Sequence, residues 1–82
     1  MPQSQFSVGY SRAIGKLIEL RRKAGFTQAT VASKMGMRQS DVSKIERRER
    51  RIDIYELHLY ASAIGLDAVE LDRALADEFR PD

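Results

Sequence analysis

The first apolar pattern along the chain has the period of an α-helix. Apolar residues recur at helical spacing at Ile14, Leu17, Ile18 and Ala24, with Leu20 alongside. Gly25 follows directly, and glycine commonly ends a helix because it tolerates the left-handed conformation. The spacing therefore predicts a helix over about residues 11–24.

Two shorter apolar patterns follow, with only a few residues between them. Thr27 can cap a second helix, which carries one apolar face before Gly36 breaks it. That face consists of Val31, Ala32 and Met35. Beyond Met37, Val42 and Ile45 form a narrow apolar stripe whose neighbours are polar or basic. The pattern predicts a short second helix and a third helix that contains the basic stretch 38–51.

Two capping boxes mark the start of two further helices. Asp53 with Glu56, and Asp67 with Glu70, place an acceptor and an acid three residues apart before an apolar periodic run. Gly65 separates the two runs. With almost no strand pattern, the sequence predicts an all-α fold, a compact five-helix domain that occupies residues 1–82.

Length and composition narrow the classes of function. A chain of 82 residues buries only about 60% of its unfolded surface, so it has little material for a deep catalytic cleft. The absence of cysteine excludes disulfide scaffolds, thiolate zinc sites and thiol nucleophiles. Neither a signal peptide nor a run of about 20 apolar residues is present. We therefore expect a soluble, cytoplasmic protein without a membrane partner.

Charge is distributed unevenly along the chain. The net charge is only +2, but residues 12–51 hold twelve basic and four acidic residues, and residues 52–82 hold two basic and eight acidic residues. Such asymmetry is typical of nucleic-acid binding. The basic half is therefore the expected contact surface, although two helices with basic outer faces would give the same count.

The short connection around Gly36, with small Ala32 where two helices must cross closely, is typical of a helix-turn-helix. Segment 28–47 reads QATVASKMGMRQSDVSKIER. It resembles the DNA-binding motif of the Cro and lambda-repressor type, the XRE-like transcriptional regulators, over about residues 14–71. The matching features are Gln28, Val31, Ala32, Met35, Gly36, Met37, Val42, Ile45, the KIER ending, and Ala61, Ala63, Ile64 and Gly65.

The resemblance implies that the third helix is the recognition helix, whose N-terminal residues lie in the major groove of DNA. The residues expected to face base edges are Arg38, Gln39, Ser40, Ser43, Lys44 and Arg47. Glutamine can bond adenine with both amide atoms, arginine or lysine can bond guanine, and serine suits either. Gln39 and Lys44 are the strongest candidates. The alternative is that these are ordinary solvated side chains.

Phosphate contacts are expected on both sides of this helix. Thr27 and Gln28 resemble family residues that bind phosphate at a helix N-terminus, where free amides favour an anion. The arginines expected to contact phosphates are Arg48, Arg50 and Arg51.

Four residues depart from the family pattern or from the chemistry of a DNA-binding helix. Arg48 replaces a glycine, so either the helix continues or Arg48 adopts a conformation that costs about 1 kcal/mol. Arg38 replaces a capping Ser or Thr. Asp41 complements the helix dipole in the first turn, and Glu46 is expected to pair with a neighbouring arginine rather than to approach DNA.

A homodimer is expected, because one recognition helix reads few base pairs and a two-fold pair reads a near-palindromic operator. The expected interface lies in the acidic C-terminal half, with the C-terminal helix placed within residues 66–82. Its residues are Tyr55, Leu59, Leu71, Leu75 and Phe79. The alternative is that the apolar stripe of the last helix folds back on the first helix.

The sequence gives no support to an enzyme. His58, the single histidine, is interpreted as a half-buried structural residue, and the acidic residues 67–78 lack the spacing of a calcium loop. No cofactor and no metal are expected. The hypothesis is a DNA-binding transcriptional regulator, with repression favoured over activation. An antitoxin that also binds a protein toxin through its C-terminal half is the alternative, and a contact with RNA polymerase stays open.

Overall fold

The computed structural model describes residues 7–79, and these residues form helices without any strand. The helices are α1 (Val8–Lys23), α2 (Gln28–Met35), α3 (Gln39–Glu46), α4 (Ile54–Ala63) and α5 (Ala68–Leu75), followed by the 3₁₀ turn η1 (Ala76–Glu78). The predicted all-α, five-helix fold is confirmed. Residues 1–6 and 80–82, including the end of the predicted C-terminal segment 66–82, lie outside the described range.

Local capping explains where the helices begin. The predicted boxes at Asp53 and Asp67 are both present, with reciprocal bonds to the residues three positions later. Thr27 caps α2 as predicted and accepts a bond from the Thr30 N–H at 3.1 Å. The first helix begins earlier than predicted, at Val8, because the Ser7 hydroxyl accepts a bond from the Tyr10 N–H at 3.0 Å.

The end of α3 is unusual. Arg48 lies at φ 61°, in the left-handed region that glycine normally occupies, as Gly36 does at φ 73° after α2. The Arg48 N–H bonds the Ile45 carbonyl at 3.1 Å, and the Glu49 N–H bonds the Lys44 carbonyl at 2.8 Å. This is the Schellman pattern of a helix end. Of the two predicted alternatives, the strained Arg48 is the one observed, at a cost of about 1 kcal/mol.

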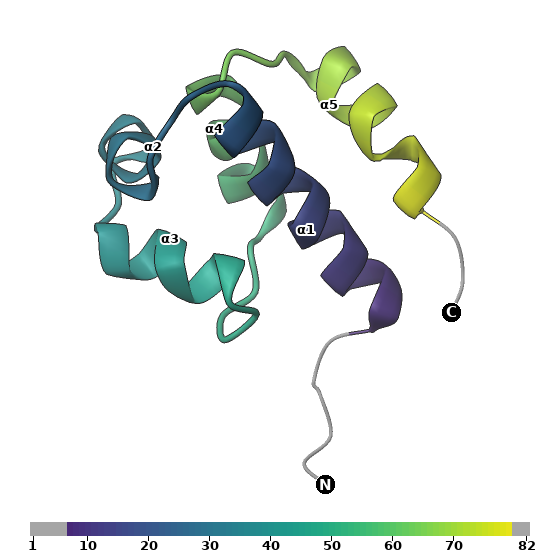
Figure 1. Cartoon of the computed structure of the whole chain (residues 1–82), viewed down its shortest axis with the longest axis horizontal. Coiled ribbons are helices and arrows are strands. Elements are labelled where there is room, and N and C mark those ends of the chain that lie inside the picture. Colours follow the sequence, from purple (N-terminus) through teal and green to yellow (C-terminus); the bar gives the residue numbers. More distant parts are fainter. Residues whose placement is uncertain (1–6, 80–82) are drawn as a thin grey trace, which may run out of the picture.

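The five helices surround one apolar core (Figure 1). In this arrangement α2 packs against α3 and α4, α1 contacts α3 and α5, and α4 contacts α5. The buried members are Ile14, Leu17, Val31, Ala32, Met35, Val42, Ile45, Tyr60, Ala61, Ala63, Ile64, Leu71 and Leu75. Helices α2 and α3 therefore share one core with α1 and α4.

The predicted apolar stripe of the C-terminal helix is not a surface feature. Leu71 and Leu75 are only 3% and 2% exposed, because α5 lays its apolar face on α1 and α4. The helix ends at Leu75, and Phe79 lies beyond η1 with 61% of its surface exposed. Their prediction as exposed interface residues is wrong for Leu71 and Leu75.

His58 also differs from the prediction, since it is exposed rather than half-buried. Its Nδ1 lies 2.7 Å from the Ile54 carbonyl, one turn earlier on α4. The ring is therefore held on the surface of the helix by a local backbone contact.

Candidate nucleic-acid interface

The turn between α2 and α3 sets the angle of the two helices. Gly36 ends α2, and the Met37 N–H returns to the Ala32 carbonyl at 2.9 Å. Ala32, Val42 and Ile45 are buried where the two helices meet, so the opposite face of α3 is directed to solvent. The local geometry is that of a helix-turn-helix.

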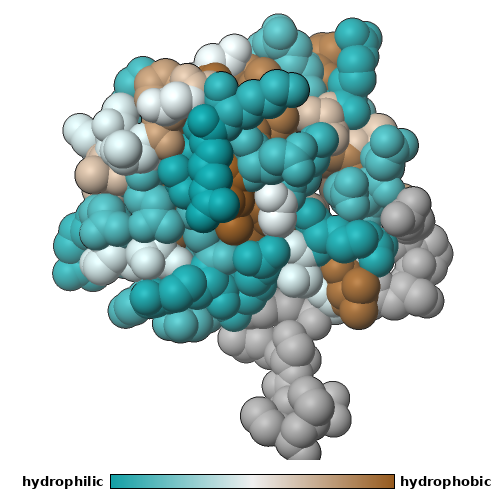
Figure 2. Space-filling view, in the orientation of Figure 1, coloured by the Kyte–Doolittle hydropathy of each residue, from teal (hydrophilic) through white to brown (hydrophobic). Residues whose placement is uncertain are grey.

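The six residues predicted to read bases lie along this outer side of α3 or at its two ends. Arg38 occupies the N-cap position and Arg47 the C-cap position. All except Ser43, which is half-buried, are exposed: Arg38, Gln39, Ser40, Lys44 and Arg47. Figure 2 shows hydrophilic side chains over this part of the molecule. The structure thus brings the predicted residues together on one accessible surface, while their contact with bases stays a prediction.

Two of these cations are paired within the chain. Arg38 Nε lies 3.3 Å from Asp41 Oδ2, and Arg47 Nε lies 3.2 Å from Glu49 Oε2. The side-chain bond from Arg38 lowers the pKa of Asp41. Asp41 also accepts the Arg38 backbone N–H at 3.3 Å, whereas the arginine side chain, which has no acceptor, caps nothing. Both arginine pairs are exposed and are therefore easily exchanged for phosphate.

Lys44 differs from these arginines. Its side chain is exposed, and no group of residues 7–79 forms an ion pair or hydrogen bond with its ammonium. The ammonium is therefore available to a ligand without breaking an existing contact.

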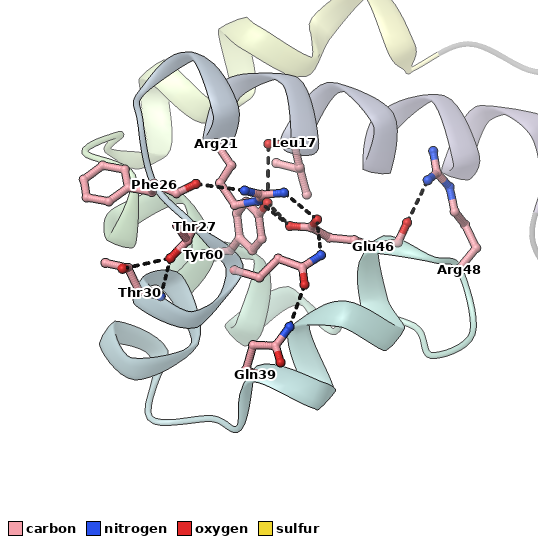
Figure 3. A network of polar contacts seen from close by, with 10 residues as sticks. Leu17, Arg21, Phe26, Thr27, Thr30, Gln39, Glu46, Arg48 and Tyr60 are labelled. Atoms are coloured by element: carbon pink, nitrogen blue, oxygen red, sulfur yellow. Dashed lines mark hydrogen bonds and ion pairs between the residues drawn. The ribbon is translucent and has the colours of Figure 1, made fainter.

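A buried ion pair lies directly behind α3 (Figure 3). Arg21 Nε and Nη2 donate to the two carboxylate oxygens of Glu46 at 2.8 and 2.9 Å, and Arg21 Nη1 donates to the Phe26 carbonyl at 2.8 Å. The Tyr60 hydroxyl donates to Glu46 Oε2 at 2.7 Å. The predicted pairing of Glu46 with an arginine is confirmed, but the partner is Arg21 from α1. Together with Tyr60, this pair joins α1 to α3 and α4.

The pKa values follow from this packing. Burial favours the neutral form of Glu46, but the bonds from Arg21, Gln28 and Tyr60 outweigh it and lower the pKa of the carboxyl. The bond to Glu46 raises the pKa of Arg21. Burial, together with the nearby carboxylate, raises the pKa of Tyr60. At neutral pH the pair is therefore charged and Tyr60 is a neutral donor.

Sequence reasoning did not identify this network. Arg21 continues the apolar face of α1 at helical spacing after Ile14 and Leu17, and Glu46 follows Val42 by one turn on the inner face of α3. Opposite charges at two core positions were the signal that could have predicted the pair.

Two amide side chains extend the network to the surface. Gln28 Nε2 donates to Glu46 Oε1 at 2.9 Å, and Gln39 Nε2 donates to Gln28 Oε1 at 2.8 Å. Gln28 is half-buried and Gln39 is exposed. An open groove beside them runs from the end of α1 to the first turn of α2, and it is lined by Arg21, Arg22, Gly25, Phe26, Thr27, Gln28, Ala29 and Gln39. The predicted phosphate-binding residues Thr27 and Gln28 thus lie at an accessible helix N-terminus.

Arg48 is placed differently from its prediction as a phosphate contact. Its Nε and Nη2 donate to the hydroxyl and carbonyl oxygens of Ser11 at 3.1 and 2.7 Å, and Nη1 donates to the Glu46 carbonyl at 2.7 Å. A Cβ on Gly15 would lie 3.2 Å from Nη2, so glycine leaves room for the guanidinium. This placement argues against a phosphate contact, because the half-buried side chain already anchors the end of α3 to α1.

The next two arginines also contact the chain itself. Arg50 forms a two-pronged pair with Glu56 at 2.9 and 2.7 Å, and the bond raises the pKa of Arg50. Arg51 stacks over the Tyr10 ring at 4.9 Å from its centroid, while the Tyr10 hydroxyl accepts the Ile52 N–H at 3.0 Å. Arg50 is therefore largely committed to Glu56. Arg51 is exposed, and its phosphate contact stays a prediction.

Other kinds of site find no support in residues 7–79. No three carboxylate or imidazole side chains in this range are grouped so that they could hold a metal ion. None of the helices described has the length and apolar character needed to cross a membrane.

Comparison with known proteins agrees with this geometry. The Helix-turn-helix family profile matches residues 17–71. An XRE-family like protein from Pseudomonas syringae pv. tomato str. DC3000 is 36% identical, with a TM-score of 0.77 and 88% of each chain covered. The wild-type restriction-modification controller protein C.Esp1396I is 26% identical, with a TM-score of 0.81 over 89% of this chain and 96% of the controller. No curated protein matches. The chain belongs to the XRE-like helix-turn-helix family of DNA-binding regulators.

Proposed function

We propose that this protein is a sequence-specific transcriptional repressor that binds a near-palindromic DNA operator as a homodimer. The observation that carries the proposal is the exposed polar face of α3, where Gln39, Ser40 and Lys44 share one surface and the Lys44 ammonium has no partner within residues 7–79. These side chains can bond base edges in the major groove. C.Esp1396I, of similar fold, has been seen as a tetramer with its natural 35 base-pair operator and bound to a 25 base-pair operator site.

Selection from random DNA tests the first part of the proposal. The bound pool should converge on a near-palindrome whose half-site centres are about 10 base pairs apart, one turn of DNA. Placing that site across a promoter should lower transcription when the protein is added. A pool that stays random after repeated rounds would contradict sequence-specific binding.

The dimer interface is proposed at an exposed apolar surface formed by Ile54, Tyr55 and Phe79, which are 76%, 71% and 61% exposed. Ile54 and Phe79 line a groove of about 350 Å³ between the start of α1, the start of α4 and η1. Leu59, one turn after Tyr55 on α4, is half-buried. A second copy would cover this surface and place two recognition helices about 34 Å apart. Leu71 and Leu75 would support it from beneath.

Sedimentation tests the dimer with a matched control. Tyr55→Asp combined with Phe79→Asp should give a folded monomer that binds half-sites weakly. Val69→Asp is the control, since Val69 is 65% exposed and lies outside the groove lining. A parent protein that sediments as a monomer, both free and on its operator, would overturn the dimer. A protein partner that copurifies from the native host and covers the same surface would favour the antitoxin instead.

A further inference from the structure

The Gln28–Gln39 pair has a fixed hydrogen-bond direction, and its cause is buried. Glu46 is 6% exposed and accepts four bonds, two from Arg21, one from Tyr60 and one from Gln28. An ionised carboxylate can only accept hydrogen bonds. Gln28 must therefore turn its NH₂ group inward to Glu46, which turns its carbonyl oxygen toward Gln39.

The direction fixed at Gln28 also fixes the hydrogen bond of Gln39 at the surface. Because Gln28 offers Gln39 only an acceptor, Gln39 must use one of its two N–H groups for this bond, as observed at 2.8 Å. Within residues 7–79, this leaves Gln39 with a free carbonyl oxygen and one free N–H (Figure 3). An isolated glutamine could rotate its amide by half a turn at little cost. Here, rotating Gln39 alone would place its carbonyl against the Gln28 carbonyl, and rotating both amides would place the Gln28 carbonyl against the Glu46 carboxylate.

The two orientations of Gln39 suit different bases. An acceptor beside a donor matches adenine, which presents the N6 amino group and N7. The reversed amide would accept from Gln28 and present two N–H groups, which match the two acceptors of guanine, O6 and N7. The direction of the pair therefore decides whether Gln39 presents an acceptor and a donor, which match adenine, or two N–H donors, which match guanine.

We propose that Glu46 is a positioning residue that, through Gln28, orients the Gln39 amide so that it selects adenine over guanine at one operator position. The proposal rests on the proposed function, since it assigns a base preference to the recognition helix. It gives the buried ion pair a role in specificity besides its role in joining α1, α3 and α4.

The experiment compares base preferences rather than affinities. Gln39→Ala first identifies the base pair that Gln39 reads, in the operator selected with the parent protein. Gln28→Met then removes both amide bonds with a side chain of similar length, while Arg21, Glu46 and Tyr60 keep their mutual contacts. At the identified position the adenine-to-guanine preference should fall by about tenfold, with other positions unchanged. If Gln28 also binds a phosphate, its removal would weaken binding evenly on all sequences and would not alter this preference.

Glu46→Gln is the complementary variant. Its amide can donate to the Gln28 carbonyl, so the reversed direction becomes accessible and guanine should gain at the same position. Because this variant alters a buried pair, unfolding curves must accompany it, and Gln28→Met decides the question if it does not fold. Side-chain amide NMR of the free parent should show one Gln39 amide proton protected and one exchanging freely.

The outcomes separate the two proposals. A parent preference for guanine at the Gln39 position, or an adenine preference that is unchanged in Gln28→Met, would overturn the role of Glu46 while leaving the regulator intact. A parent protein without any base preference would overturn the proposed function, and with it the role of Glu46.

Discussion

The outer face of α3 and the loop that follows it have similar charge but different organisation. On α3, Lys44 has no partner within residues 7–79 and Arg38 is held only by an exposed pair. In the loop 48–51, Arg48 is bonded to Ser11 and Arg50 to Glu56. The basic residues of both regions were expected to contact DNA. The difference shows that an arginine in a basic run can stabilise the fold instead of contacting DNA. The partners of its guanidinium decide between these two roles.

The difference follows from what each region must do for the fold. Helix α3 is held through its inner face by Val42, Ile45 and Glu46, so the fold depends little on its outer residues. The loop has no apolar face of its own to hold it, and arginine side chains connect it to α1 and α4. Stability and DNA binding should therefore respond separately to substitutions in the two regions.

The largest expected effect is on stability and concerns Arg48. Arg48→Ala should lower the free energy of unfolding by about 2–3 kcal/mol, because it removes three charged hydrogen bonds and keeps the left-handed backbone. Arg48→Gly loses the same bonds but relieves the strain, so it should recover about 1 kcal/mol. Urea unfolding of both variants measures the difference.

DNA binding by Arg48→Gly is the second measurement, and it tests whether Arg48 also contacts DNA. Once corrected for the folded fraction, Arg48→Gly should keep the affinity and the salt dependence of the parent. A folded Arg48→Gly that loses affinity steeply at low salt would show that Arg48 leaves Ser11 to bind a phosphate.

The next effect concerns the face of α3. Gln39→Ala or Lys44→Ala should weaken operator binding by about 1–3 kcal/mol and leave random DNA nearly unaffected, because each removes a base contact. Both side chains are exposed, so the free energy of unfolding should change by no more than about 0.5 kcal/mol. Equal losses on operator and random DNA would make these residues general contacts rather than base readers.

Features that depend on neighbours in the sequence were predictable. The caps at Thr27, Asp53 and Asp67 each depend on a few adjacent positions. The outer face of α3 was also predictable, since it lies opposite the apolar stripe.

Partners distant in the sequence were not predictable in the same way. Arg21 is 25 residues from Glu46, and Ser11 is 37 residues from Arg48. Leu71 and Leu75 show a different limit, because an amphipathic helix has the same pattern whether it packs on its own chain or on a second copy. Only the arrangement of α1, α4 and α5 decides between these two cases.

A smaller effect is expected in the salt dependence of binding. Arg51→Gln should reduce the slope of log affinity against log salt concentration by about 0.9 if its side chain contacts one phosphate. Arg50→Gln should change the slope little, because Arg50 is paired with Glu56. Arg73→Gln on α5, which lies across α1 from α3 in Figure 1, is the charge-matched control. Equal slope changes for Arg50→Gln and Arg51→Gln would contradict the inference that Arg50 is held by Glu56 while Arg51 contacts a phosphate.

The smallest expected effect is a pH dependence that belongs to the loop. The bond from Arg50 lowers the pKa of Glu56 below its ordinary value. A carboxyl with a lowered folded pKa contributes stability above its unfolded pKa of about 4.3, and this contribution disappears as the pH falls through the folded value. Because the Arg50 side chain is 37% exposed and solvent screens the pair, the contribution should stay below about 1 kcal/mol.

Unfolding curves of the parent and Glu56→Gln measured from neutral to acidic pH test this expectation. The parent should be the more stable at neutral pH, and the difference between the two should vanish in acid, where Glu56 is protonated and resembles glutamine. Glu46 is present in both proteins, so its own titration cancels in the difference. Asp72→Asn, at an exposed position on α5, is the charge-matched control. A difference that persists unchanged into acid would mean that Glu56 acts through packing or capping, and that the Arg50 pair does not fasten the loop electrostatically.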